Sequence, residues 1–109
     1  MPGQTCQTAY PWEFAVDYTF WAFADQNYWL HTELDGQEYD LYVSYDPAVQ
    51  CAVWAGFGTC EEMDFYGQQG EPWEGMDFFP YIGLFSTQLF IRILAPVGVM
   101  VTVHIELTP

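Results

Sequence analysis

Apolar and polar side chains alternate with a period of two along most of this 109-residue chain. The alternation is clearest from Tyr39 to Asp46, where Tyr, Leu, Val and Tyr take every second position. Successive side chains of a β-strand point to opposite faces, so this period is typical of strands with one buried face. No run of ten or more residues shows a helical period. We therefore expect an all-β fold.

Turn-forming glycine, proline, aspartate and asparagine residues separate seven or eight short strands. The expected strands are Phe14–Ala24, Tyr28–Leu34, Tyr39–Asp46, Gln50–Ala55, Met63–Tyr66, Met76–Ile82, Gln88–Leu94 and Val97–Leu107. This number and spacing predict a jelly-roll-like β-sandwich of antiparallel strands, forming a single domain over residues 13–109. Residues 1–12 hold two prolines and several polar residues, which predicts an extended N-terminal arm.

Three cysteines bear on the redox compartment. Cys51 and Cys60 flank Gly56-Phe57-Gly58, where we expect the chain to double back as a hairpin. Paired strands bring Cα atoms to about 4.5–5.5 Å, so the sequence predicts a Cys51–Cys60 disulfide. Cys6 is then left for an intermolecular cross-link. The alternative is that all three thiols are reduced, since free cysteine is a common small buried residue.

Acidic residues dominate the charge. Fifteen carboxylates face a single cation, Arg92, which gives a net charge of −14. Such a surface repels phosphates, so direct nucleic-acid binding is excluded. Three interpretations remain: bound calcium, an acidic DNA mimic that inhibits a nucleic-acid-binding protein, or solubility in a salty or acidic habitat. The 51% hydrophobic content excludes a disordered chain.

Two sets of residues are candidate metal ligands. Calcium takes six to eight oxygen ligands, and the acids at the centre of the chain are candidates for them. Each His-x-Glu-Leu motif places an imidazole and a carboxylate on one strand face, so two neighbouring strands would hold a transition-metal ion. The calcium candidates are Asp46, Glu61, Glu62 and Asp64, and the transition-metal candidates are His31, Glu33, His104 and Glu106. The alternatives are a solvated acidic loop and two solvent-facing pairs.

Binding is favoured over catalysis by the inventory of side chains. Ser44 and Ser86 are not in a Gly-x-Ser-x-Gly turn, and no phosphate loop or cofactor motif is present, so we expect no enzyme. Aromatic residues make up 20% of the chain. Flat amphipathic rings suit interfaces, and Trp12, Trp21 and Trp29 are the predicted interface residues. No apolar run approaches the roughly 20 residues of a membrane span, and no secretion signal is visible.

The order of these segments resembles the bacterial pre-peptidase C-terminal (PPC) domain family. The matching segments are Gly3–Ala9, Asp17–Phe20, Asp40–Val43, Cys51–Cys60, Leu89–Leu94 and Val99–Leu107. The resemblance implies a small jelly-roll sandwich of a secreted protein. It also implies a non-catalytic accessory role in secretion, in binding to matrix or carbohydrate, or in assembly, sometimes with calcium. Pro96–Val99 departs from the family's usual glycine-tyrosine pattern before the last strand.

The sequence thus predicts an extracellular or cell-surface structural and adhesive module. In the preferred version, copies assemble into a filament or surface layer through the N-terminal arm and exposed aromatics. One alternative is an accessory module of a secreted protein that binds polysaccharide or a matrix protein. The other is the acidic DNA mimic.

Overall fold

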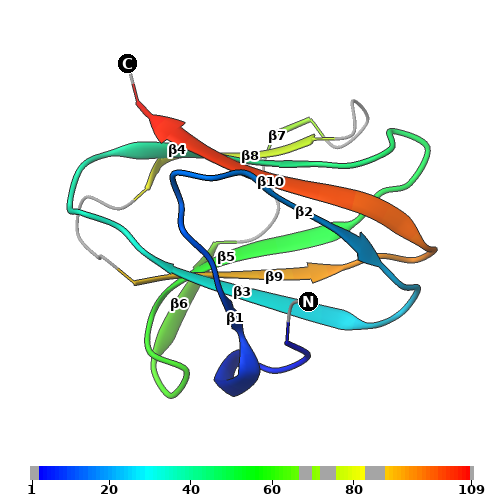
Figure 1. The fold of residues 1–109 in the computed structure, drawn as a ribbon, viewed down its shortest axis with the longest axis horizontal. Coiled ribbons are helices and arrows are strands. Elements are labelled where there is room, and N and C mark those ends of the chain that lie inside the picture. Colours follow the sequence, from blue (N-terminus) through cyan, green and yellow to red (C-terminus); the bar gives the residue numbers. More distant parts are fainter. Residues whose placement is uncertain (1–2, 67–69, 72–75, 83–87, 109) are drawn as a thin grey trace.

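Two β-sheets pack face to face in the computed structural model, which describes residues 3–66, 70–71, 76–82 and 88–108 (Figure 1). Side chains are described for all of these except 63–66, 70–71 and 80–81. Sheet A contains, in order, β1 (Tyr10–Pro11), β3 (Asn27–Glu33), β9 (Gln88–Leu94), β5 (Ala52–Gly58) and β6 (Met63–Tyr66). Sheet B contains, in order, β2 (Tyr18–Ala22), β10 (Val99–Leu107), β4 (Tyr39–Ser44), β8 (Met76–Ile82) and β7 (Gly70–Glu71).

The strand order is that of a jelly roll. Eight of the described strands have four or more residues, and the chain passes from one sheet to the other at almost every connection between them. Each long strand is antiparallel to its long neighbours. The predicted all-β sandwich is therefore confirmed. The described part of the chain holds one three-residue 3₁₀ helix, η1 (Cys6–Thr8), and no helix there has the length and apolar character to cross a bilayer.

The inner faces of the two sheets form the core. Nine aliphatic side chains are completely buried between the sheets, and each stabilises the fold by about 1.5–3 kcal/mol relative to an exposed position. They are Leu30, Leu41, Val43, Val53, Leu89, Ile91, Ile93, Val101 and Val103. All nine lie in predicted strands and at positions of the predicted alternation.

Asp77 is the exception among the inward-facing residues. It belongs to the predicted strand Met76–Ile82, lies on the inner face of β8 and is 0% exposed. The hydroxyl of Tyr45 donates a hydrogen bond of 2.8 Å to its Oδ2 atom. Burial, and after it the nearby Asp77 carboxylate, raises the pKa of the Cys51 thiol to about 11.

The N-terminal arm lies along the edge of its own sheet A. The main-chain oxygen of Gly3 accepts a hydrogen bond from the Trp29 N–H, and the Trp12 N–H donates to the main-chain oxygen of His31. Between these two contacts, β1 pairs with β3 in parallel. The chain then turns, because the Val16 N–H bonds to the Glu13 oxygen. This turn explains why β2 begins at Tyr18, four residues later than predicted.

The predicted Cys51–Cys60 disulfide is wrong, since Cys60 pairs with Cys6 across a Cα distance of 5.8 Å. Gly56 and Phe57 do not turn the chain but lie within β5, which spans about 20 Å at 3.3 Å per residue. Cys51 and Cys60 therefore lie beyond opposite ends of one strand. Cys51 is a free, buried thiol, and Cys6 is not available for an intermolecular cross-link.

Replacing Cys6 by alanine should lower the free energy of unfolding by about 4 kcal/mol, because the disulfide closes a long loop in the unfolded chain. The matched control is Cys51→Ala, which removes a buried thiol and should cost about 1 kcal/mol. Guanidinium titration measures both differences. Equal losses in the two variants would contradict the assigned pairing. Chymotryptic mapping checks it directly, since Phe57 separates Cys51 from Cys60.

Candidate functional site

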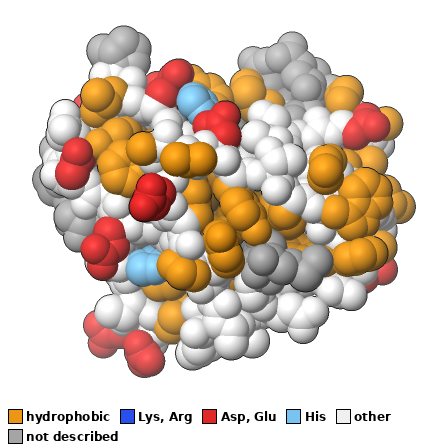
Figure 2. All heavy atoms as spheres, viewed as in Figure 1, with side chains coloured by type: hydrophobic (Ala, Val, Ile, Leu, Met, Phe, Trp, Pro, Cys, Tyr) orange, Lys and Arg blue, Asp and Glu red, His pale blue; other side chains and the backbone are white. Residues whose placement is uncertain are grey.

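Four large hydrophobic side chains form an exposed group at the end of sheet B where β2 ends and β10 begins. They are Trp21, Phe23, Val97 and Met100, and their exposed fractions run from 46% to 54%. Trp21 and Met100 are direct cross-strand neighbours, and the rings of Trp21 and Phe23 meet edge to face at 6.5 Å. We call these four residues the apolar patch. Figure 2 shows hydrophobic side chains gathered on this side of the molecule.

The Trp21 ring lies directly against the backbone of Gly98. A Cβ atom at position 98 would lie 2.7 Å from the ring carbon Cζ2, so only glycine lets the ring lie this close to the turn between β9 and β10. The ring therefore packs on this turn while nearly half of the residue faces solvent. Clusters of exposed apolar side chains of this kind mark interaction surfaces more often than single exposed residues do.

The opposite end of the same outer face is acidic. Asp17 Oδ1 lies 2.6 Å from Nδ1 of His104, and Glu106 Oε2 lies 3.4 Å from Nε2 of the same ring. Asp17 precedes Trp21 by four residues, which is about 13 Å along a strand. Thr19 and Thr102 lie between the two ends and share a hydrogen bond of 2.9 Å. The outer face of sheet B thus changes from apolar to acidic along its strands.

The pKa of His104 is raised, mainly because the Asp17 carboxylate accepts a hydrogen bond from the ring and to a lesser extent because Glu106 does so. Partial burial of the ring opposes this shift. Both ring nitrogens of His104 are directed at carboxylates. When this ring is protonated, both nitrogens carry hydrogens and neither has a lone pair to offer a metal ion.

The predicted transition-metal site is not formed. Each His-x-Glu pair does share one strand face, as expected, but His31 and Glu33 lie on β3 of sheet A while His104 and Glu106 lie on β10 of sheet B. All four alternate with buried residues, so both pairs point outward. Stacked sheets are about 10 Å apart, and side chains on opposite outer faces cannot meet at one ion.

The predicted calcium ligands lie on different sheets. Asp46 follows β4 of sheet B, and its Oδ1 atom accepts a hydrogen bond from the Ala48 N–H. Glu61 and Glu62 occupy the turn between β5 and β6 of sheet A, and the side chain of Asp64 lies outside the described ones. Among the side chains that the structure describes, no group of three or more His, Cys, Asp or Glu is arranged so that it could hold a metal ion. Calcium binding stays a prediction.

The single cation of the chain is enclosed by aromatic rings on the outer face of sheet A. Arg92 lies across from Trp29 on one neighbouring strand and from Trp54 on the other, with its guanidinium carbon 5.8 Å and 4.7 Å from the two ring centroids. Its Nε atom donates a hydrogen bond of 2.8 Å to Asn27. Trp29, a predicted interface residue, is thus half-buried and packs on this arginine.

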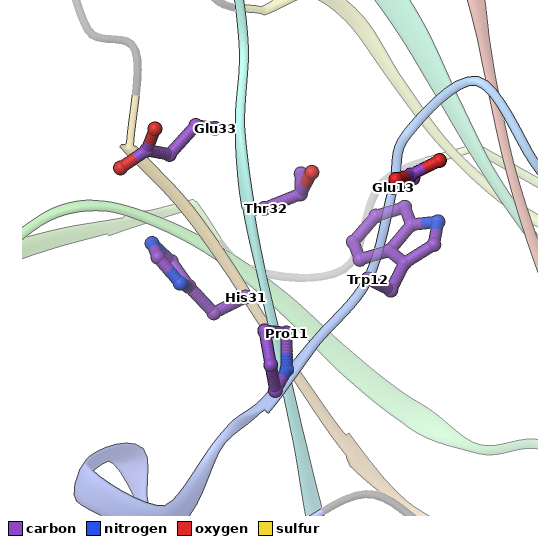
Figure 3. A pocket seen from close by; sticks show the side chains of 6 residues that line it. All are labelled: Pro11, Trp12, Glu13, His31, Thr32 and Glu33. Carbon is purple, nitrogen blue, oxygen red and sulfur yellow. The ribbon is translucent and has the colours of Figure 1, made fainter.

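A pocket of about 300 Å³ opens where β1 ends beside β3 (Figure 3). Trp12, predicted as an interface residue, is instead buried and forms one wall, with its indole N–H donating to the Val16 oxygen. His31 and Glu33 lie on the other side of β3, joined through Gln88, whose amide donates to Glu33 at 3.1 Å. The lining residues are Pro11, Trp12, Glu13, His31, Thr32 and Glu33.

Comparison with solved structures identifies the fold. The pre-peptidase C-terminal domain of a collagenase from Bacillus anthracis matches with a TM-score of 0.70 and 5% identity, covering 89% of this chain and 93% of that domain. The fold is that of a PPC domain. AlgX of Pseudomonas aeruginosa matches with a TM-score of 0.58 and 14% identity over 85% of this chain and 26% of its own.

A third solved structure with this arrangement of strands is the periplasmic g-type lysozyme inhibitor PliG of Aeromonas hydrophila. It matches with a TM-score of 0.53 and 11% identity, and the match covers 89% of this chain and 95% of that one. No protein-family model matches the sequence, and no curated protein matches it. The likeness to PPC domains is thus one of fold.

Replacing Asp17 by asparagine should lower the pKa of His104, because it removes the largest cause of the raised value. Glu106→Gln should lower it less.

The raised pKa of His104 also makes stability depend on pH. A raised pKa in the folded state stabilises the protein fully below the unfolded pKa, near 6.5, and the stabilisation is lost as pH rises through the folded value. The loss is at most about 1 kcal/mol, since these side chains are largely exposed. NMR titration of the His104 ring measures the shift, and an unchanged pKa in Asp17→Asn would contradict the assignment.

Proposed function

We propose that this chain is a non-catalytic binding module of a secreted or cell-surface protein, and that the outer face of sheet B docks on a protein partner. The apolar patch is the observation that supports this most strongly. An aromatic ring packed against Gly98, with a second ring and two aliphatic side chains nearby, has the composition of an interface hot spot.

The chemistry of the partner follows from the two ends of this face. An apolar group on the partner would cover Trp21 and Met100, and lysine or arginine about 13 Å away would meet Asp17 and Glu106. The net charge of −14 would steer such a basic surface into contact. A matrix or cell-wall protein with a basic surface has this character.

The structure gives less support than the sequence did to the assembly of identical copies. The N-terminal arm pairs with β3 of its own chain, and Cys6 is bonded to Cys60. Two copies, each with a charge of −14, repel one another, and Arg92 is stacked between tryptophans where it offers little to a second copy.

The location and the binding role have separate support. Disulfides persist in oxidising compartments, which favours an extracellular or surface location. One protein of this fold, PliG, is by its name an inhibitor of g-type lysozyme and so acts on another protein. The fold therefore accommodates a protein-binding role.

Replacing Trp21 by alanine should weaken binding to peptides selected on the wild-type chain from a random phage-displayed library. The expected loss is about 30-fold, the effect of removing a hot-spot side chain. The selected peptides should combine apolar residues with lysine or arginine. The matched control is Leu107→Ala, which removes an equally exposed hydrophobic side chain from the other end of β10. It should leave binding within about twofold.

Three results would contradict the proposal. The first is a set of selected peptides that bind Trp21→Ala as tightly as the wild type. The second is binding of a polysaccharide that survives the Trp21 replacement, which would favour a glycan-binding module. The third is concentration-dependent association of the chain with itself that Trp21→Ala abolishes, which would restore the assembly hypothesis.

A further inference from the structure

We propose that the pocket at the end of β1 is a second binding site, and that it takes an extended peptide segment carrying two successive basic residues. This site lies on the edge of sheet A and shares no residue with the apolar patch. The site lies where the N-terminal segment stops pairing with β3, after Pro11.

The main chain of β3 offers an open pairing position at this point. Trp29 and His31 both use main-chain groups to bond to the N-terminal segment, through the Trp29 N–H and the His31 oxygen. Alternate residues of a strand present their N–H and C=O to the same edge, so Glu33 also faces this edge. β1 has ended there, and no residue that the structure describes bonds to the Glu33 main chain on this side.

The Thr32 side chain lines the same pocket. Thr32 is 3% exposed, and its hydroxyl has no hydrogen bond among the described residues. A hydroxyl can both donate and accept, so this group can form a hydrogen bond with a ligand atom in the pocket. Figure 3 shows Thr32 directed to the side of β3 on which Trp12 and Glu13 lie.

The side chains around the pocket favour a cationic peptide. An added strand places successive side chains on opposite faces. On one face, a basic side chain would lay its stem against Trp12 and reach the Glu13 carboxylate. On the other face, the next side chain would meet Glu33 beside His31. Each face thus carries one exposed carboxylate, and the charge of the whole chain adds to the attraction for cations.

A peptide fits this chemistry better than a sugar does. The N–H and C=O of Glu33 together match the main chain of an added strand, which is the basis of strand addition at sheet edges. Sugar hydroxyls would satisfy the same two groups but would leave Glu13 and Glu33 without a counter-charge. We therefore expect recognition to depend on positive charge.

The probe is an N-acetylated, C-amidated peptide of alternating valine and threonine with two lysines at its centre, and its partner probe has glutamines in place of the lysines. On the wild-type chain, the lysine peptide should shift the main-chain amide resonance of Glu33 in a saturable NMR titration. It should bind about tenfold more tightly than the glutamine peptide.

Glu13→Gln should weaken binding of the lysine peptide about two- to fivefold, as expected for one exposed ion pair. The matched control is Glu61→Gln, which removes an exposed carboxylate in the turn between β5 and β6, outside both proposed surfaces, and should have no effect. Trp21→Ala should also leave this binding unchanged, so that failure here is distinct from failure of the proposed partner surface.

Each of three outcomes would overturn the proposal. One is no shift at Glu33 with millimolar lysine peptide. Another is equal affinity for the lysine and glutamine peptides, which would show that charge is not recognised. The last is tighter binding of a neutral oligosaccharide than of the lysine peptide at the same resonance, which would make the pocket a sugar site.

Discussion

The structure depends on the burial of two inner sheet faces against each other. Because side chains alternate along a strand, every residue assigned to the core fixes its neighbours on the outer surface. Trp21, His31 and His104 are outward-facing for this reason, since the residues on either side of each one are buried. The candidate binding surfaces are thus a direct consequence of the packing.

The N-terminal segment covers one part of the edge of sheet A and leaves another part open. It closes the edge of sheet A as far as Pro11, and the Cys6–Cys60 disulfide joins its helical turn to the turn after β5. The segment then leaves β3, and this departure creates the pocket lined by Trp12 and Thr32. One segment therefore has two effects, since it removes a sheet edge that would favour aggregation and leaves a short part of that edge open.

Local patterns in the sequence were sufficient for the strands but not for contacts between distant residues. β6, β8 and β9 have the bounds that the alternation predicts. The cysteine pairing failed because Gly56-Phe57-Gly58 suggested a turn, whereas the turn follows at Thr59, whose hydroxyl accepts from the Glu62 N–H. The metal prediction failed because strands alternate between sheets, which separates β3 from β10. The burial of Asp77 was not predicted, because its partner, Tyr45, is 32 residues away.

The central claim is that the N-terminal segment folds onto its own chain, and amide hydrogen exchange tests it most directly. Trp29 and Trp12 donate their main-chain N–H groups to Gly3 and His31 respectively. The account predicts that both amides exchange slowly in the oxidised monomer, at rates that do not change with protein concentration. Rapid exchange in dilute solution, with protection appearing only as concentration rises, would show instead that the arm pairs with another molecule.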